Sequence, residues 1–407
     1  MLFLYKIFYT IFIMPAMMLL PKTRAGLKQR LGFHDFKNKE KTLWIHAVSV
    51  GELLALHDFI KNIDGFEIIL STSTPQGMEL AKSKMSEYCK QIVYFPYDCG
   101  CCIQGAIKAI NPGLVLIMET EIWPAFLRTL KRKGIPAVII NGRISERTFK
   151  SYRRLKFFFK PIMQMFTGIL AQSDADAQRF IDIGASPELV RVMGNIKFDI
   201  QKPDIKTLDL ELNDNPLFIA GSTHSGEDKI ALDAYLEAKK NKDNLKFLLV
   251  PRHLERLEEI KDVLGGLKFG LKSKGATFKD YDILILDTTG ELAAAYAYST
   301  VAFIGGSFNN TGGHNPLEAS IWNKPVLSGP NIKNFRHIYG QLCEFGCAKI
   351  VETPEELSRT LSLLLDDEQG ELYRIQMSEN CKIVFKKNRG ATDYLMNLLF
   401  KWRKYDN

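Results

Sequence analysis

Short apolar runs alternate with amphipathic stretches along most of this 407-residue chain. In the first half, helical patterns such as Glu52–Ile63, Gly77–Met85 and Pro124–Lys133 separate the apolar runs. We predict strands at Thr42–Ala47, Glu67–Ser71, Gln91–Phe95, Leu114–Met118, Ala137–Asn141 and Gly168–Ala171. Strands separated by helices of about 10–15 residues are typical of a parallel sheet whose right-handed crossovers cover both faces.

The second half repeats this rhythm after the polar stretch Gln201–Asn215. The strands predicted there are Pro216–Ala220, Lys246–Pro251, Ile283–Leu286, Val301–Ile304 and Pro325–Leu327. We therefore predict an α/β protein of two Rossmann-like, doubly wound domains, residues 21–200 and 216–407, that face each other across a cleft, with residues 201–215 as the linker. In such sheets, ligands bind beyond the carboxyl ends of the strands.

The first twenty residues, MLFLYKIFYTIFIMPAMMLL, carry one charge, at Lys6. Four basic residues follow at once: Lys22, Arg24, Lys28 and Arg30. A signal peptide is disfavoured because the start is not basic and no small-x-small cleavage site follows. We predict that residues 1–20 are a membrane-associated segment, either spanning the bilayer or lying in its interface. The flanking basic residues would keep the body on the cytoplasmic side.

Composition narrows the class of protein. The chain is 46% hydrophobic and 25% charged, as globular domains are, and its net charge of +8 favours an anionic partner. Its seven cysteines are odd in number and form no disulfide framework, which favours a reducing compartment. Cys99-Gly-Cys101-Cys102 lacks a second pair at ligand spacing, so we predict no metal site and no cofactor.

Glu52 comes where a predicted strand turns into a helix, after Ser49-Val50-Gly51. One interpretation is a first-turn carboxylate that stabilises the helix dipole by about 0.3–1 kcal/mol. The other is a carboxylate that meets a substrate. A second acidic pair, Glu119 and Glu121, follows the buried strand Leu114–Met118. Because a buried, unpaired charge is costly, two acidic strand ends in one domain favour the substrate interpretation.

The second half has the features of a phosphate site. In FIGGSFNNTGGHNPLEAS, glycine pairs precede a predicted helix that begins near Asn315-Pro316, whose N–H groups could bind an anion without a metal. Arg252 and the loop Thr289-Gly290-Glu291 follow two further strands. Together they predict a nucleotide site. Neither a GxxxxGK[ST] loop nor a GxGxxG fingerprint after the first strand is present in the sequence.

The stretch RISERTFKSYRRLKFFFK, residues 143–160, carries seven basic residues and one acid, Glu146. It is either a solvated helix face or a surface for anionic lipid headgroups, and the apolar N-terminus favours the lipid surface. We predict no nucleic-acid partner, because the chain has no nucleic-acid-binding signature.

These motifs occur together in a known order. HAVSVGE, STSTPQG, YFPYD, LVLIMETEIWP, NGRIS, GNIKFD, GSTHSGE, VPRH, DTTGEL and GGHNPLE make the chain resemble the 3-deoxy-D-manno-octulosonic acid (Kdo) transferases. The resemblance implies a GT-B fold and an inverting glycosyltransferase of lipopolysaccharide biosynthesis. Such an enzyme moves Kdo from CMP-Kdo to the lipid A precursor at the cytoplasmic face of the inner membrane, without a metal.

The resemblance also implies roles for single residues. Glu52 matches the family's catalytic base, while Glu119 and Lys197 match groups that stabilise the transition state. The implied donor contacts are Pro251, Arg252, Thr289, Gly290, Glu291, Asn315, Pro316, Leu317 and Glu318. Two positions depart from the family pattern: Thr289 stands where methionine is usual, and Gly142 stands where alanine is usual and is expected to loosen its turn.

Three alternatives remain at this point. The chain could be another membrane-associated GT-B glycosyltransferase with a UDP- or ADP-sugar donor. It could also be a GT-B-like sugar-nucleotide epimerase, although an epimerase needs no membrane segment. A catalytically inactive lipid-binding relative is disfavoured because Glu52, Glu119, Lys197 and Arg252 are all present.

Overall fold

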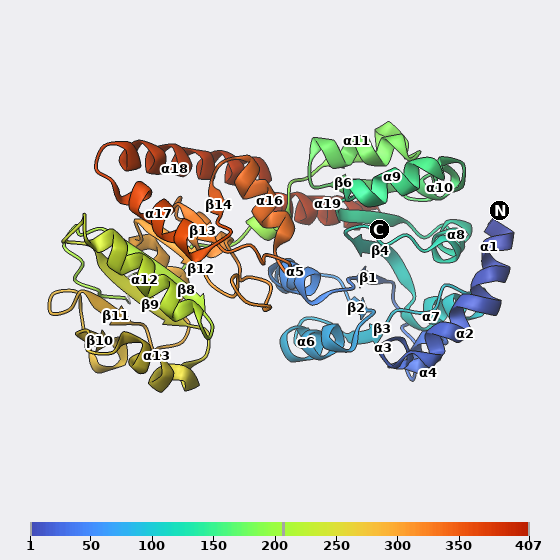
Figure 1. The fold of residues 1–407 in the computed structure, drawn as a ribbon. Helices are drawn as coiled ribbons and strands as arrows, with labels where there is room; N and C mark the ends of the chain where they lie inside the picture. Colours follow the sequence, from blue (N-terminus) through green and yellow to red (C-terminus); the bar gives the residue numbers. More distant parts are fainter. Residues whose placement is uncertain (1, 206–207, 406–407) are drawn as a thin grey trace. The chain divides into compact units, whose positions relative to one another are not determined.

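The computed structural model describes residues 2–205 and 208–405, and the chain divides into two compact units (Figure 1). The first unit contains residues 1–199 and 388–407, and the second contains residues 200–387. Of the predicted linker, residues 206–207 lie outside the described residues.

The first unit is built on a parallel sheet with the strand order β3-β2-β1-β4-β5-β6-β7 in the described part of the chain. Its strands are β1 (Thr42–His46), β2 (Ile68–Thr72), β3 (Gln91–Tyr94), β4 (Pro112–Met118), β5 (Ala137–Gly142), β6 (Gly168–Ala171) and β7 (Val190–Val192). Its helices are α1 (Leu2–Phe8), η1 (Tyr9–Ile13), α2 (Met14–Leu19), α3 (Pro21–Arg24), α4 (Leu27–Arg30), α5 (Val50–Asn62), α6 (Pro75–Met85), α7 (Gly100–Ile110), α8 (Pro124–Arg132), α9 (Glu146–Arg154), α10 (Lys156–Met163), α11 (Asp174–Asp182), η2 (Pro187–Leu189), η3 (Ile196–Phe198) and α19 (Ala391–Tyr405).

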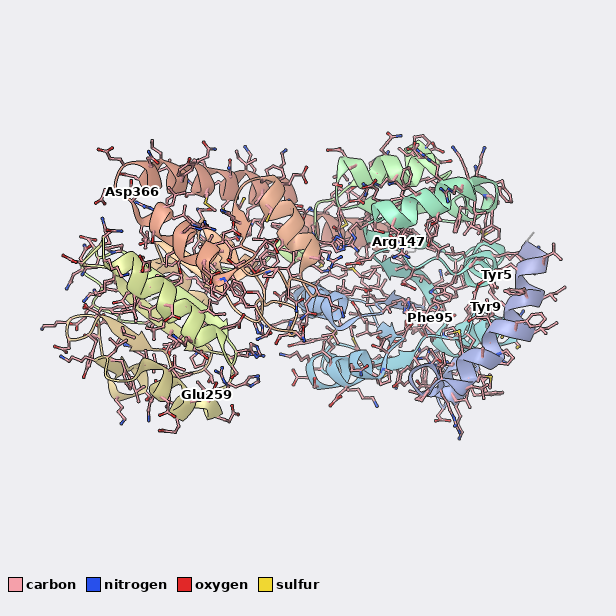
Figure 2. All side chains as sticks on the ribbon, in the orientation of Figure 1. Tyr5, Tyr9, Phe95, Arg147, Glu259 and Asp366 are labelled. Carbon is pink, nitrogen blue, oxygen red and sulfur yellow. The ribbon has the colours of Figure 1, made fainter. Side chains whose placement is uncertain are left out.

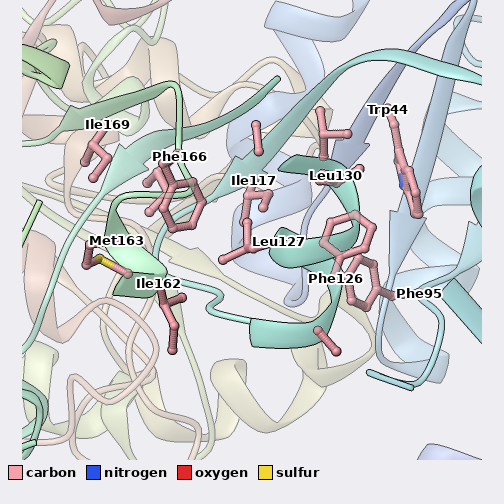
Figure 3. Packing of buried hydrophobic residues seen from close by; sticks show 14 of the residues in the cluster. Trp44, Phe95, Ile117, Phe126, Leu127, Leu130, Ile162, Met163, Phe166 and Ile169 are labelled. Carbon is pink, nitrogen blue, oxygen red and sulfur yellow. The ribbon is translucent and has the colours of Figure 1, made fainter. Parts of the chain in front are cut away.

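Both faces of this sheet are buried, because neighbouring residues of a strand point to opposite faces. Leu43 and Ile45 of β1 pack into one apolar cluster, and Trp44 between them packs into the other. Figure 3 shows the second cluster, where the ring of Phe126 lies 5.1 Å from that of Trp44 and 5.0 Å from that of Phe95. This double burial explains why the strands read as continuous apolar runs in the sequence.

The second unit has the strand order β10-β11-β9-β8-β12-β13-β14, again parallel in the described part. Its strands are β8 (Leu217–Thr223), β9 (Lys246–Pro251), β10 (Phe269–Leu271), β11 (Ile283–Ile285), β12 (Val301–Ile304), β13 (Val326–Ser328) and β14 (Ala348–Ile350). Its helices are α12 (Glu227–Lys239), η4 (Leu254–Arg256), α13 (Leu257–Leu264), η5 (Lys272–Lys274), α14 (Leu292–Ala295), η6 (Tyr296–Tyr298), α15 (Leu317–Ser320), α16 (Arg336–Glu344), α17 (Pro354–Leu365) and α18 (Gln369–Asn388).

The α/β class with two doubly wound parallel sheets is thus confirmed, and each predicted strand has a counterpart. Three strands were not predicted: β7, β10 and β14. Each is three residues long and includes one polar or small residue, namely Arg191, Gly270 or Lys349, so its apolar run is too short to stand out from the loops.

The last helix, α19, belongs to the first unit, whereas the predicted second domain extended to residue 407. Its side chains Ala391, Leu395 and Leu399 pack into the same core cluster as β1 and β4. The Asp199 carboxylate fixes the start of α19 by accepting hydrogen bonds from the backbone N–H groups of Gly390 (2.7 Å) and Thr392 (2.6 Å). The chain therefore returns to its first unit after completing the second.

The N-terminal segment α1–η1–α2 lies against the body of the first unit by one face. Figure 2 labels Tyr5 and Tyr9 on this segment; Tyr9 is buried, and the Tyr5 hydroxyl donates a 2.8 Å hydrogen bond to Asp98. Its other face exposes large apolar side chains, namely Leu4, Ile7, Phe8, Ile11, Phe12, Leu19 and Leu20. Within residues 2–205 and 208–405, we find no helix with both the length and the apolar character needed to cross a membrane.

Candidate active site

The predicted catalytic residues of the first unit follow neighbouring strands. The chain winds outward from β1 to β2 and β3, then returns to add β4 on the other side of β1. The edge beyond β1 and β4 is therefore a topological switch point, where doubly wound sheets bind ligands. Glu52 lies in the first turn of α5, just after β1, and Glu119 and Glu121 directly follow β4.

Glu52 completes a capping box at the start of α5. Its carboxylate accepts hydrogen bonds from the Ser49 hydroxyl (2.7 Å) and from the backbone N–H groups of Val48 (2.9 Å) and Ser49 (3.3 Å). In return, Ser49 Oγ accepts from the backbone N–H of Glu52 at 3.2 Å. These bonds hold the carboxylate in one orientation. Oε1 accepts two of them and Oε2 accepts one, so Oε2 keeps a lone pair for a ligand.

Glu119 lies beside Lys197 in a strained backbone conformation. Its φ of 57° is in the left-handed region, which costs a non-glycine residue on the order of 1–3 kcal/mol and is typical of functional sites. Lys197 Nζ donates a 3.0 Å hydrogen bond to its carboxylate, and an Arg143 guanidinium nitrogen is 4.0 Å from the other oxygen. Lys197 comes from η3, which is positioned by the 3.1 Å hydrogen bond from the Ile196 N–H to the Asn141 side chain.

The electrostatics of this cluster favour proton uptake. Burial raises the pKa of Glu52, and the negative charge of Glu119 raises it further. Burial also raises the pKa of Glu121 to about 7, with added repulsion from Glu52 and Glu119. Carboxylates held this way are stronger bases than carboxylates in water, which suits proton abstraction near neutral pH.

Gly142 does not loosen its turn, contrary to expectation. It is the buried last residue of β5, and a Cβ there would lie 2.9 Å from the Ile139 side chain and 3.0 Å from the Phe180 ring. The glycine therefore permits close packing of β5 against α11, just before Arg143.

The predicted donor residues of the second unit also follow adjacent strands. Pro251 ends β9 and Arg252 follows it, the loop 289–291 follows β11, and residues 315–318 follow β12. Arg252 is exposed, and its charge lowers the pKa of Glu318, which burial raises more strongly. The helix predicted near Asn315-Pro316 is the single turn α15, capped by a 3.1 Å hydrogen bond from the Leu317 N–H to Asn315. Because α15 is a single turn, its dipole is weaker than that of the helix expected from the sequence and stabilises a bound anion less.

The loop Thr289-Gly290-Glu291 lies at the same edge but is held differently. Glu291 accepts a hydrogen bond from the Thr288 hydroxyl within the loop. Thr289 is exposed, and Gly290 has a φ of 88° with open space around its Cβ position. A backbone contact to a ligand is therefore possible at this loop whatever the side chain of residue 289.

Two histidines that the sequence analysis did not single out also lie at this edge. His224 follows β8, His314 follows β12, and their Nε2 atoms are 2.9 Å apart, so one nitrogen donates and the other accepts. Burial lowers the pKa of His314 to about 4, and His224 and Arg252 lower it further. The signal in the sequence was a histidine in each of two glycine-containing strand ends, but their pairing depends on β8 and β12 being neighbours.

Glu227 is the first residue of α12, the helix after β8, just as Glu52 lies in the first turn of α5, the helix after β1. It is 1% exposed and accepts from the N–H groups of His224 (3.0 Å), Gly306 (2.6 Å), Ser307 (2.8 Å) and Phe308 (2.8 Å). Four backbone donors satisfy both oxygens, so Glu227 fixes the glycine loop after β12.

The basic stretch 143–160 forms the loop after β5, α9 and most of α10. Its aromatic residues Phe149, Tyr152 and Phe158 pack against the core, and Phe159 is buried against Tyr152. Arg153, Arg154 and Lys156 are exposed. Two apolar side chains next to them, Leu155 and Phe157, are exposed as well. The Phe158 ring lies 6.2 Å from that of Tyr5, so α10 contacts the N-terminal segment.

Comparison with known proteins gives a consistent result. Residues 25–200 match the family profile described as 3-Deoxy-D-manno-octulosonic-acid transferase (kdotransferase). The chain is 32% identical over 395 residues to the 3-deoxy-D-manno-octulosonic acid transferase of Haemophilus influenzae, covering 93% of this chain and 92% of that one. It is 30% identical to the transferase of the same name from Chlamydophila psittaci, covering 87% and 85% of the two chains.

Among solved structures, the chain is similar to the UDP-GlcNAc 2-epimerase from Neisseria meningitidis bound to UDP-GlcNAc. The TM-score is 0.56 at 15% identity, covering 89% of this chain and all of the epimerase. A likeness at this identity shows the fold alone, and it supports the predicted GT-B-like architecture.

Proposed function

This chain belongs to the 3-deoxy-D-manno-octulosonic acid transferase family, and we propose that it transfers Kdo from CMP-Kdo to the lipid A precursor with Glu52 as the general base. As a member, it is a glycosyltransferase of lipopolysaccharide synthesis. The observation that carries the finer proposal is the oriented Glu52 carboxylate, whose pKa is raised by burial and by Glu119.

In the proposed reaction, a sugar hydroxyl of the acceptor attacks the anomeric carbon of Kdo while Glu52 takes its proton. CMP leaves from the opposite face, so the anomeric configuration inverts. A hydroxyl is a weak nucleophile, and general-base assistance is typically worth about 10²–10⁴-fold. All three capping bonds are accepted by the Glu52 carboxylate, and Oε2 keeps the lone pair on which the proton can be taken up.

Lys197 and Glu119 form the second part of this site. Their 3.0 Å pair holds an ammonium group next to the base, and the strained backbone of Glu119 fixes the direction of the pair. We propose that Lys197 stabilises the negative charge that develops on the acceptor oxygen as its proton leaves, because a fixed cation costs no reorganisation as the charge moves.

The donor would bind at the carboxyl edge of the second sheet. Arg252 can pair with the phosphate or the Kdo carboxylate, since a guanidinium forms charge-assisted, bidentate bonds with either. Backbone groups of residues 289–291 and 315–318 would hold the nucleotide. CMP is a good leaving group, so we propose that the transfer needs no metal.

We further propose that the enzyme works at the cytoplasmic face of the inner membrane. The segment α1–η1–α2 exposes apolar side chains, and its Tyr5 ring contacts Phe158, which follows the exposed residues Arg153, Arg154, Leu155, Lys156 and Phe157 along the chain. An apolar face bordered by cations is suited to lie in the interface of an anionic bilayer. This arrangement would bring the enzyme to a glycolipid whose acyl chains remain in the membrane.

The decisive experiment combines purified protein, CMP-Kdo generated in situ and lipid IVA, with products counted by mass spectrometry. We expect Kdo-bearing lipid with release of CMP. UDP- and ADP-sugars supplied in place of CMP-Kdo should give no transfer, and UDP-GlcNAc without an acceptor should not be epimerised. Transfer from a UDP- or ADP-sugar would show that the chain is a glycosyltransferase with another donor. Epimerisation of UDP-GlcNAc without an acceptor would show that it is a sugar-nucleotide epimerase.

Membrane contact has its own test. Replacing Arg153, Arg154 and Lys156 with glutamine should weaken binding to anionic vesicles and raise the apparent KM for the lipid acceptor, with unchanged affinity for CMP-Kdo. Each cation near such a surface contributes about 1 kcal/mol, and salt should reduce the difference. A triple variant with unchanged vesicle binding would mean that the stretch is only a solvated helix face.

A further inference from the structure

Three cysteine sulfurs converge at the start of α7. Cys99 is the N-cap residue of this helix, and Cys101 and Cys102 lie in its first turn. The Sγ atom of Cys99 is 2.8 Å from that of Cys102 and 3.5 Å from that of Cys101. All three sulfurs lie within 4.8 Å of one another.

One side of the cysteine cluster is buried in the protein, and the other side is exposed to solvent. Cys99 and Cys102 are 2% and 1% exposed and pack with Tyr9 and Tyr97 beneath the N-terminal segment. Cys101 is exposed. Among the described residues, the side chains that offer ligand atoms to this group are these three cysteines. A bound ion would thus have three protein ligands and a fourth position that solvent can reach.

We propose that Cys99, Cys101 and Cys102 form a binding site for a soft cation, Zn²⁺ or Cu⁺. Thiolates are the ligands that such cations prefer. In tetrahedral zinc sites with Zn–S bonds of about 2.3 Å, sulfurs lie roughly 3.8 Å apart, so the present cluster needs to open by only about 1 Å. Small rotations of the cysteine side chains provide such a change.

The start of the helix stabilises the charge of this site. Three thiolates around Zn²⁺ or Cu⁺ carry a net negative charge. The N–H groups in the first turn of α7 have no intrahelical partners, and the positive end of the helix dipole lies there. The eleven residues of α7 give this dipole three turns of aligned peptide units.

The site also borders the contact that holds the N-terminal segment. Asp98, next to Cys99, accepts hydrogen bonds from the Tyr5 hydroxyl (2.8 Å) and from the N–H groups of Ala125 (3.0 Å) and Phe126 (2.7 Å). A cation bound to Cys99 would fix the backbone beside Asp98. It would thereby also hold the carboxylate to which Tyr5 of α1 donates its hydrogen bond. None of the three cysteines is among the proposed catalytic residues, so the test of this site measures cation binding rather than transfer activity.

The test uses the full-length protein in detergent, reduced and stripped of metal. Zn²⁺ is titrated against a chromophoric chelator, and Cu⁺ against a chelator specific for that ion. We expect one tightly bound cation per chain. Serine at position 99, 101 or 102 should weaken binding at least ~100-fold, because loss of a direct ligand should exceed the about 10–100-fold loss seen for outer partners. Cys343→Ser in the second unit is the matched control and should bind like the wild type.

Two further measurements separate folding and oxidation from binding. Cys101 is exposed, so Cys101→Ser should melt like the metal-free wild type, and the cation should raise the melting temperature of the wild type only. Co²⁺ in place of Zn²⁺ should give thiolate-to-metal absorption that falls in each serine variant. Three results would each overturn the proposal: no binding by the reduced protein, binding that survives Cys101→Ser, or a Cys99–Cys102 disulfide as the only chemistry of the cluster.

Discussion

Glu52 and Glu227 occupy the same place in two similar sheets, and their surroundings differ. Each follows the first strand of its unit and lies at the start of the next helix, after a serine-containing turn with glycine. Glu52 accepts hydrogen bonds only from its own turn among the bonds described for its side chain. Glu227 accepts three of its four from the loop that follows the neighbouring strand β12.

The residues that follow the neighbouring strand determine the role of each glutamate. Beside Glu52, β4 brings Glu119, a like charge that raises the pKa of the base. Beside Glu227, β12 brings three backbone donors that occupy the carboxylate. The same strand-turn-helix unit thus gives a candidate catalytic group in one half and a structural clamp in the other. A glutamate after a strand is informative only together with the loop that faces it.

The largest difference should come from replacing Glu227 with glutamine. One carboxylate oxygen would become an NH₂ group facing two backbone N–H donors, which leaves buried donors unsatisfied at about 1–3 kcal/mol each. We expect the free energy of unfolding of the second unit to fall by about 3 kcal/mol or more, as measured by urea unfolding followed by circular dichroism. Glu52→Gln is the matched control. Its free energy of unfolding should fall by less than about 1 kcal/mol, because glutamine also completes a capping box. Equal losses in the two variants would contradict the comparison.

Glu52→Gln should instead affect catalysis. Turnover should fall at least ~100-fold because glutamine cannot take the proton, while CMP-Kdo binding stays unchanged. The measurement is single-turnover transfer to lipid IVA together with donor titration. Exposed Glu79 on α6 serves as the control, and Glu79→Gln should react like the wild type. Near-normal turnover by Glu52→Gln would remove this residue from the role of base.

Arg252→Ala tests the positive edge of the second sheet. Loss of a charge-assisted hydrogen bond to the donor should weaken CMP-Kdo binding by about 1.5–3 kcal/mol, a Kd increase of roughly 10- to 150-fold. Isothermal titration calorimetry measures it, with exposed Arg359→Ala on α17 as the control. If the two variants bind equally well, the donor does not contact Arg252.

Glu121 should make the stability of the protein depend on pH. Its folded-state pKa of about 7 lies above the ordinary value of 4.5, so the folded state holds a proton that the unfolded state releases between these values. The stability contributed by this proton is complete below pH 4.5 and is lost as the pH rises through 7. A shift of this size corresponds to about 3 kcal/mol, so between pH 4 and pH 8 the free energy of unfolding of Glu121→Gln in urea should rise by up to that amount relative to the wild type. A constant difference would show that Glu121 is not shifted.

The sequence predicted those parts of the fold that depend on local pattern. Buried strands such as Leu114–Met118 are recognisable because both faces of the sheet are covered, and the order of elements then fixes which strand ends are neighbours. The spacing of Ser49 and Glu52 also predicts the capping box that the structure shows. Ser-x-x-Glu before an apolar run is a recognisable signature.

What the sequence could not predict depends on contacts between distant residues. The pairing of His224 with His314 spans 90 residues and requires β8 next to β12. The three cysteines were visible as a motif, but whether their sulfurs converge depends on side-chain geometry at the helix start. The pattern of α19 predicts a helix, yet nothing in its own residues indicates which of two apolar cores it will cover.

The return of α19 to the first unit has a consequence for biosynthesis. Ala391, Leu395 and Leu399 are the last residues of that core to leave the ribosome, after the whole of residues 200–387. At roughly 5–20 residues per second, the first unit waits about 10–40 seconds with one apolar face of its sheet incompletely covered. We therefore expect the second unit to reach its final structure first, against the order of synthesis. Chains stalled after residue 387 should be cut by protease within residues 1–199, and added peptide Ala391–Tyr405 should protect them.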